Sequence, residues 1–301
     1  MLKNKKILVT GGAGFIGSNL VRRLLNEGAE VFVLVRKSSN LWRLDDVKEK
    51  LKLCVADLAD ELSLKNLIQE IKPQGVFHLG ATTIMRGVIS EPEMIEKVNV
   101  EGTKNLIKAL GDIDYDFFIN TSTYSENSSD DYAKSKRKAT DFCTDYAKKK
   151  QKPIVTLRIF TPYGPYIQKG RLVFQVLTKS MRNENIEMSS PDTMRDFIYI
   201  DDLIDLYITL SNRARENAGE AFNAGFGVLT SLKEVANTAI AITNSQTKVI
   251  WGALPKLSYD FVAVADITKN AEKLGWKPKV NFEEGIQKTY KWLKDNLHRY
   301  E

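Results

Sequence analysis

The chain has 301 residues, 43% of them hydrophobic and 27% charged, which is enough for one large or two closely joined globular domains. Its formal charge of +6 comes from basic residues scattered along the sequence, which disfavours nucleic-acid binding and suits an anionic small substrate. Two isolated cysteines, a short apolar start and the lack of long apolar runs disfavour a disulfide framework, a metal centre and a membrane span, so we expect a cytoplasmic protein.

Short apolar runs alternate with stretches of helical periodicity through the first half of the chain. Their near-continuous apolar character predicts strands that are covered on both faces, as in a doubly wound parallel sheet. We therefore expect a Rossmann-type α/β dinucleotide-binding domain over residues 1–160. The expected strands are 6–10, 30–35, 51–56, 75–80, 116–121 and 154–159, and the expected helices are 16–27, 61–71, 93–110 and 131–150.

The pattern changes after residue 160. Residues 161–301 combine short strands with helices, among them one near 172–183 and a last one that begins near 283, after the helix-stopping "GWKP". This part is expected to be a smaller mixed α/β domain that mainly binds substrate. Because no flexible linker separates the two parts, we expect a tight interface with a cleft, and the chain can return to the first domain.

A glycine-rich loop follows the first predicted strand. In "TGGAGFIGS", Gly12, Gly14 and Gly17 fit G-x-G-x-x-G, and Gly11, Gly14 and Gly17 fit a spacing of three. Small residues here permit a tight turn and let the backbone approach a pyrophosphate, which the amides at the start of the next helix face. The position between a strand and a helix is the context that supports dinucleotide binding, with Phe15 and Ile16 included in the expected contact set.

The end of the second strand bears on the choice of cofactor. NAD-binding proteins typically place Asp or Glu there, on the adenosine ribose hydroxyls. The sequence "VLVRKSS" has Val35 at that position, followed by Arg36, Lys37 and Ser38, which can hold a 2′-phosphate. These residues favour NADP over NAD, and a solvated basic loop is the alternative.

The stretch "INTSTYSENSSDDYAKSK" (residues 119–136) places Tyr132 and Lys136 one helical turn apart, shortly after the hydroxyls of Thr121, Ser122 and Thr123. Taken alone, this stretch also fits a surface helix preceded by a hydroxyl-rich loop.

With these motifs the sequence resembles the extended short-chain dehydrogenase/reductase family, the NAD(P)-dependent epimerases and dehydratases of nucleotide sugars, over nearly its whole length. The residues that carry the resemblance are "TGGAGFIGS" (10–18), Asp57-Leu58, "HLGA" (78–81), Asn99 in "VNVEGT", "YAKSK" (132–136), "LRIFTPYGP" (157–165), "RDFIYIDD" (195–202) and "LGWKP" (274–278).

The resemblance implies a role for each matching residue. Tyr132 would be the catalytic acid or base, Lys136 would bind the nicotinamide ribose, and Thr123 would supply the catalytic hydroxyl. Arg195 would neutralise the substrate diphosphate, in a substrate set that also includes Thr123, Thr161 and Arg171. The remaining cofactor-binding set comprises Asp57 and Leu58 near the adenine, and Leu79, Gly80, Ala81, Asn99 and Phe160, although Phe160 also suits a residue that only shapes the cleft.

This residue set has a chemical reason. Hydride transfer at a sugar carbon requires proton transfer at the attached oxygen, so the tyrosine pKa must fall from about 10 towards neutrality, roughly 4 kcal/mol. A lysine ammonium about 4 Å away at an effective dielectric near 20 contributes energy of that order. Thr123 would hold the reacting oxygen by a hydrogen bond. His78 is interpreted as a hydrogen-bonded histidine at a strand end, without a catalytic or metal-binding role.

The sequence departs from the family pattern at several positions. Tyr124 and Ser125 stand where 4,6-dehydratases have an Asp-Glu pair after the catalytic threonine, which disfavours dehydration. The short spacing from Thr123 to Tyr132 resembles the 4-ketoreductases that make CDP-abequose and CDP-paratose. Thr161 stands where many epimerases have Asn, and segment 254–264 lacks an arginine that many members supply to the second phosphate. Either Arg171 or Lys256 would serve instead, or catalysis would be weakened.

We therefore expect an NAD(P)-dependent oxidoreductase of a nucleoside-diphosphate sugar, most consistent with a 4-keto-sugar reductase. The alternatives are a nucleotide-sugar 4-epimerase and a non-catalytic dinucleotide-binding sensor. No metal, nucleic-acid or membrane partner is expected. A homodimer through the helices near 93–110 and 131–150 is expected, because "MIEKVNVEGTKNLIKAL" has enough apolar positions for two faces; burial of all of them within the monomer is the alternative.

Overall fold

The computed structural model describes residues 2–82, 91–255 and 262–300. The chain divides into two compact units, of which the first comprises residues 1–158 and 204–222 and the second comprises residues 159–203 and 223–301. The boundary expected near residue 160 thus falls at 158, and a later segment returns to the first unit.

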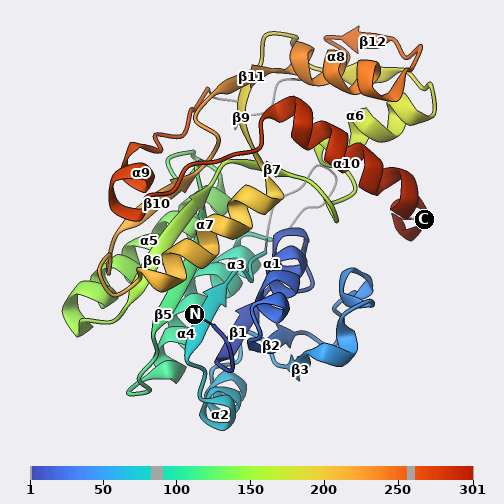
Figure 1. The fold of residues 1–301 in the computed structure, drawn as a ribbon. Helices are drawn as coiled ribbons and strands as arrows, with labels where there is room; N and C mark the ends of the chain where they lie inside the picture. Colours follow the sequence, from blue (N-terminus) through green and yellow to red (C-terminus); the bar gives the residue numbers. More distant parts are fainter. Residues whose placement is uncertain (1, 83–90, 256–261, 301) are drawn as a thin grey trace. The chain divides into compact units, whose positions relative to one another are not determined.

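The first unit is built on a parallel sheet (Figure 1). Among the described residues this sheet has seven strands in the order β10-β6-β5-β4-β1-β2-β3, and the registered pairs from β3 to β5 are all parallel. The order reverses direction between β1 and β4, as in a doubly wound fold, so the predicted Rossmann-type α/β class is confirmed. The strands are β1 (Lys6–Thr10), β2 (Glu30–Val35), β3 (Lys52–Val55), β4 (Gly75–His78), β5 (Phe117–Thr123), β6 (Ile154–Ile159) and β10 (Ala221–Ala224).

Helices cover both faces of this sheet. On one face, apolar side chains of α2, α4 and α5 form a core with alternate strand residues such as Leu8, Val76 and Phe118. On the other face, α1 contacts β1 and β2, and Tyr207 of α7 meets Phe77 of β4 edge to face. These helices and short turns are α1 (Phe15–Asn26), η1 (Trp42–Leu44), η2 (Lys48–Lys50), α2 (Glu61–Ile71), α3 (Pro92–Glu96), the π-helix η3 (Lys97–Glu101), α4 (Gly102–Leu110), α5 (Asp131–Lys150) and α7 (Ile200–Asn212).

The expected single helix over 93–110 is interrupted. A π-helical turn, in which the amide of Gly102 bonds to the carbonyl of Lys97, separates α3 from α4. The expectation of two apolar faces on this segment is wrong for the described residues. Its large aliphatic side chains, among them Ile95, Leu106 and Leu110, are buried or partly buried within the unit, and Met94 is 49% exposed.

The second unit has the mixed α/β character that the sequence predicts. In its described part, β11-β9-β7 form one small sheet and β12-β8 another. The side chain of Asp196 ties β9 to two loops, because it accepts bonds from the backbone amides of Phe226, Gly227 and Ala265. The elements are β7 (Thr161–Tyr163), α6 (Leu172–Met181), β8 (Ile186–Met188), β9 (Met194–Tyr199), β11 (Leu229–Ser231), α8 (Leu232–Thr243), β12 (Val249–Trp251), α9 (Thr268–Leu274), α10 (Phe282–Asn296) and η4 (Leu297–Tyr300).

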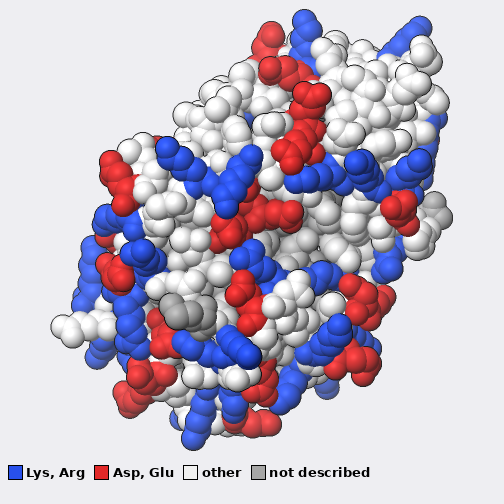
Figure 2. All heavy atoms as spheres, in the orientation of Figure 1, with Lys and Arg blue, Asp and Glu red and all other residues white. Residues whose placement is uncertain are grey.

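Surface charge is mixed in sign. In the face that Figure 2 shows, basic and acidic side chains are interspersed and neither sign forms a separate field. Among the described residues, no helix has the length and apolarity needed to cross a bilayer.

Candidate dinucleotide and catalytic site

The predicted site residues of the first unit lie along one edge of its sheet. The glycine loop follows β1, Arg36 to Ser38 follow β2, Asp57 follows β3, Leu79 to Ala81 follow β4, and Thr123 ends β5. Ligands of open α/β sheets bind outside the carboxyl ends of the strands, where the strand order reverses. The topology therefore brings residues from five strands to the edge where a dinucleotide is expected.

The glycine loop has the geometry that a dinucleotide requires. Gly11 adopts φ +69°, and a Cβ atom there would lie 2.8 Å from the amide nitrogen of Gly80. A Cβ on Gly17 would lie 2.2 Å from the carbonyl oxygen of Gly11. Gly14 is the N-cap of α1 and has no side chain that could bond to the first amides of the helix. The loop therefore fits a pyrophosphate on those amides, which include Phe15 and Ile16.

The segment after β2 forms a turn that presents basic side chains. The amide of Ser39 bonds to the carbonyl of Arg36 at 3.0 Å, and the Ser39 hydroxyl accepts the Arg36 amide at 2.9 Å. Arg36, Lys37 and Ser38 are exposed. Arg22 of α1 holds the rest of the segment, because its guanidinium bonds to the Arg43 carbonyl and to Asp46. This arrangement leaves the predicted 2′-phosphate residues at the protein surface.

The residues after β3 and β4 are less uniform. Asp57 is exposed and accepts the Ala59 amide at 2.9 Å. Leu58, by contrast, is buried in the core, where its carbonyl accepts the side-chain amide of Asn105. Leu79, Gly80 and Ala81 are half-buried. The contacts expected of these residues with the cofactor stay predictions.

Tyr132 and Lys136 lie in the first two turns of α5. The helix begins there because the carboxylate of Asp130 caps it, accepting the amide of Ala133 at 2.9 Å. Tyr132 is half-buried, whereas Lys136 is only 3% exposed. Burial lowers the pKa of Lys136 to about 8, against an opposing influence of Cys143 and Glu126. The lysine keeps its proton at pH 7 and places a buried positive charge one turn from the tyrosine.

The hydroxyl-rich stretch lies in a strand. The alternative interpretation of the sequence placed it in a surface loop. Thr121, Ser122 and Thr123 are the last residues of β5, and α5 packs against this strand. The Thr123 hydroxyl is 3.0 Å from the Ser125 hydroxyl and accepts the Ser125 amide. Ser122 instead bonds to Glu126, and Thr121 to Tyr207 at 2.6 Å. Of these three hydroxyls, that of Thr123 bonds to Ser125, in the loop that leads to Tyr132.

Glu126 is a buried carboxylate that sequence reasoning missed. It is 5% exposed and pairs with Arg158 of β6 at 2.6 Å. The hydroxyls of Ser122 and Thr140 also donate to it. The short loop between Thr123 and Tyr132 is therefore fastened to β5, β6 and α5 by one side chain. The sequence offers no feature that separates Glu126 from the other acidic residues of this loop, such as Asp130.

Asn99 is buried on the π-helix, with an amide that is bonded within the unit. Its Nδ2 donates to the Thr82 carbonyl and to the Ser135 hydroxyl, both at 2.9 Å, and its Oδ1 accepts the Thr82 amide. Ser135 in turn donates to the Tyr132 carbonyl at 2.7 Å. Asn99 thus connects the segment after β4 to the start of α5. The contact with the cofactor expected of it stays a prediction.

The predicted residues of the second unit lie on or beside three elements. Phe160 lies directly before β7, Thr161 is the first residue of β7, Arg171 is the N-cap residue of α6, and Arg195 lies in β9, opposite Thr230. Arg171 is exposed and its Nε bonds to Gln168 at 3.3 Å. Lys256, the other basic residue suggested for the second phosphate, lies outside the described residues.

Comparison with known families decides the classification. Residues 7–225 match the model of the NAD dependent epimerase/dehydratase family, which is more than half of the chain. The chain belongs to the NAD dependent epimerase/dehydratase family.

Relatives of this family match along almost the whole chain. A UDP-glucose 4-epimerase of Mycolicibacterium smegmatis is 30% identical, covering 96% of this chain and 99% of that protein. A dTDP-glucose 4,6-dehydratase of Shigella flexneri is 25% identical, covering 97% and 94%. The Bordetella bronchiseptica enzyme WbmF, solved with NAD+ and UDP, superposes with a TM-score of 0.86 at 25% identity, covering 99% of this chain and 95% of that one. The predicted family is confirmed, and both epimerases and dehydratases occur among its similar members.

Proposed function

We propose that this chain is an NADP-preferring oxidoreductase that reduces the 4-keto group of a nucleoside-diphosphate sugar. The observation that carries the proposal is the buried Lys136 one helical turn after Tyr132, on a helix that packs against the strand ending at Thr123. The relatives named above support the substrate class, because their names specify UDP-glucose and dTDP-glucose.

In this proposal the nicotinamide, when bound, supplies a hydride to the sugar carbon. The Tyr132 hydroxyl gives its proton to the carbonyl oxygen, and the Lys136 ammonium stabilises the phenolate that remains. In this proposal the Thr123 oxygen accepts from the Ser125 amide and hydroxyl, and the Thr123 proton is donated to the reacting oxygen, where negative charge develops. Arg195, Arg171 and Thr161 would bind the nucleotide-sugar part.

The preference for NADP rests on the turn after β2. Two hydrogen bonds between Arg36 and Ser39 fix its backbone, while the side chains of Arg36 and Lys37 stay exposed. We expect Arg36→Ala to weaken NADP binding by roughly 1–3 kcal/mol and to leave NAD binding unchanged, because only NADP carries the 2′-phosphate. Calorimetric titration measures both, with Lys48→Ala, an exposed basic residue of η2, as control. Equal losses for the two cofactors would show that Arg36 does not bind the 2′-phosphate.

A 4-epimerase is the second candidate, favoured by the 30% identity to a UDP-glucose 4-epimerase. An epimerase would use the same tyrosine and lysine but would return the hydride to the other face of the sugar, with no net use of cofactor. A dehydratase is less well supported. The residues after Thr123 are Tyr124 and Ser125, and the nearby Glu126 is held by Arg158 and two hydroxyls.

A non-catalytic sensor is the third candidate. Such a protein needs the dinucleotide loop but has no use for a buried lysine charge beside a tyrosine, since burying that charge has a cost in stability.

The proposal also includes a cytoplasmic homodimer. Cys54 and Cys143 are both free thiols, which suits a reducing compartment.

The experiment that tests the proposal follows NADPH absorbance with a panel of 4-keto-6-deoxy nucleotide sugars and, separately, UDP-glucose. Consumption of one NADPH per 4-keto sugar supports the reductase. Formation of UDP-galactose without added reductant supports the epimerase. Binding of cofactor with no turnover of any sugar supports the sensor.

A further inference from the structure

A chain of hydrogen bonds runs through the interior of the first unit and has His78 at its centre. His78 is 1% exposed, as expected for a hydrogen-bonded histidine at a strand end. Its Nδ1 is 2.8 Å from the Thr10 hydroxyl of β1, and its Nε2 is 3.0 Å from the Thr103 hydroxyl of α4. The imidazole therefore connects the strand before the glycine loop to the helix that follows the π-helix.

The two ends of this chain determine its direction. The amide of Gly80 can only donate, and it donates to the Thr10 hydroxyl at 2.9 Å. The carbonyl of Asn99 can only accept, and it accepts the proton of the Thr103 hydroxyl at 2.7 Å. Since that proton is used, the Thr103 oxygen is left to accept a bond from His78. The neutral imidazole then carries its hydrogen on Nε2, and Nδ1 accepts from Thr10.

The same chain reaches the proposed acid. Asn99, whose carbonyl is held by Thr103, uses its side-chain amide to donate to Ser135, and Ser135 donates to the Tyr132 carbonyl. The wide π-helical turn places Asn99 where its backbone and side chain take part in these two bonds. The bonds thus run without interruption from Gly80, beside the glycine loop, to the first turn of α5.

We infer that His78, as its Nε2–H tautomer, and Thr103 are positioning residues that hold the π-helix at Asn99 and thereby set Tyr132 relative to the glycine loop. Both side chains are buried, and in this inference they act only through Asn99 and Ser135. The inference rests on the proposed function for its consequence in catalysis, but the arrangement itself can be measured without any sugar.

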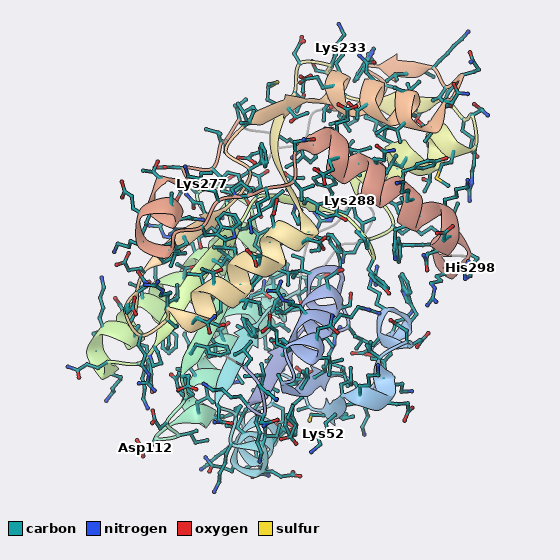
Figure 3. All side chains as sticks on the ribbon, viewed as in Figure 1. Lys52, Asp112, Lys233, Lys277, Lys288 and His298 are labelled. Atoms are coloured by element: carbon teal, nitrogen blue, oxygen red, sulfur yellow. The ribbon has the colours of Figure 1, made fainter. Side chains whose placement is uncertain are left out.

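The tautomer is measured by nitrogen NMR of the imidazoles. The chain has only two histidines, and His298 is exposed in η4 (Figure 3), so His298→Gln leaves a single signal, that of His78. We expect the Nε2–H tautomer in the wild type. In Thr103→Val the acceptor for Nε2–H is lost while the Thr10 oxygen remains, so the population should move towards Nδ1–H. An Nδ1–H tautomer in the wild type would overturn the inference.

The positioning role is tested by Thr103→Val and Thr103→Ser. Thr289→Val is a matched control, because Thr289 is also fully buried and also bonds to a carbonyl four residues earlier, in α10. In Thr103→Val we expect faster amide hydrogen exchange at residues 131–137 and a fall in kcat of roughly tenfold or more, as for a reacting group displaced by a fraction of an ångström. The dissociation constant of the cofactor should stay within about twofold, since the glycine loop itself is unchanged. Thr103→Ser should restore both exchange and kcat.

Two results would overturn the inference. One is uniform acceleration of exchange throughout the first unit, with kcat falling no further than in Thr289→Val, which would show a purely structural hydroxyl. The other is a Thr103→Val enzyme with the wild-type exchange pattern and kcat. A wild type that turns over none of the sugars refutes the proposed function, and the tautomer and exchange measurements then still decide whether His78 and Thr103 position α5.

Discussion

Tyr132 lies in the first turn of α5. The carboxylate of Asp130 caps this turn, and the hydroxyl of Ser135 donates to the Tyr132 carbonyl. Removing its hydroxyl takes away one oxygen without disturbing those contacts. We expect Tyr132→Phe to keep cofactor affinity and to lower turnover by roughly 10² to 10⁴, the usual contribution of general acid catalysis. Steady-state kinetics together with cofactor titration measures both. Turnover at the wild-type rate would remove Tyr132 from the mechanism.

The buried charge of Lys136 lowers the stability of the fold, whereas the proposed reaction needs that charge. Burial lowers its pKa to about 8 in the folded chain, whereas its ordinary value is 10.5. Between pH 8 and 10.5 the lysine is more often protonated in the unfolded chain than in the folded chain. The free energy of unfolding therefore rises with pH over this range, by up to roughly 3 kcal/mol. We expect the wild type to gain this stability between pH 8 and 10.5 and Lys136→Met not to gain it.

Chemical denaturation at several pH values gives this difference directly. Lys134→Met, which removes an exposed lysine from the same helix, is the control and should retain the wild-type slope. The same Lys136→Met protein should be at least as stable as the wild type at pH 7, although it lacks the charge that the proposed reaction needs. Parallel slopes in the wild type and Lys136→Met would contradict a desolvated lysine.

At this scale the sequence was informative where chemistry needs a fixed spacing. The i, i+4 relation of Tyr132 and Lys136 and the spacing of the glycines follow from helix and turn geometry. The partners of Glu126 did not follow, because Arg158 is 32 residues away and meets it only through the order of β5 and β6. A carboxylate bound by distant residues leaves no local pattern.

Among the elements, the loop from Thr123 to Tyr132 depends on Glu126. We expect Glu126→Gln to lower the free energy of unfolding by about 1–3 kcal/mol. The reason is that Arg158, which is partly exposed, loses the negative charge of a buried partner. Glu96→Gln, which breaks the exposed pair with Lys138, should change it by no more than about 0.5 kcal/mol. Equal effects in the two variants, measured by urea denaturation, would show that Glu126 does not stabilise the loop.

The elements also show what periodicity predicts well. Strands β1, β2 and β6 and helices α2 and α5 have the bounds expected from their apolar patterns, since each pattern directly reflects burial of one or both faces. The break at the π-helix was not predicted. Asn99 of this turn bonds to Thr82, after β4, and to Ser135 of α5, and apolar spacing does not record such bonds.

For the whole molecule, division into units was predicted only approximately. The sequence change near residue 160 indicated the boundary, but the return of residues 204–222 to the first unit has no local signal. Those residues include Tyr207, which bonds to Thr121 and packs on Phe77. A buried helix of either unit has the same apolar pattern, so composition did not assign α7.

The homodimer stays a prediction. The interface expected from the sequence was apolar, whereas the surface of α5 is charged. The exposed side chains of α5 are charged, and several of them pair within the chain, as in Lys134–Asp131, Arg137–Asp141 and Lys138–Glu96. We therefore expect association through these helices to weaken as salt screens the charges. Light scattering should give twice 34.1 kDa at low ionic strength and a falling mass at high salt. A mass of 34.1 kDa under all conditions would reject the homodimer.

The central claim is net reduction of a 4-keto sugar, and the most direct test uses NADPH carrying deuterium at the transferable position of the nicotinamide. The account predicts that a 4-keto-6-deoxy nucleotide sugar consumes one NADPH per molecule and acquires deuterium at C4. Epimerisation of UDP-glucose with neither NADPH consumption nor deuterium in the product would contradict it.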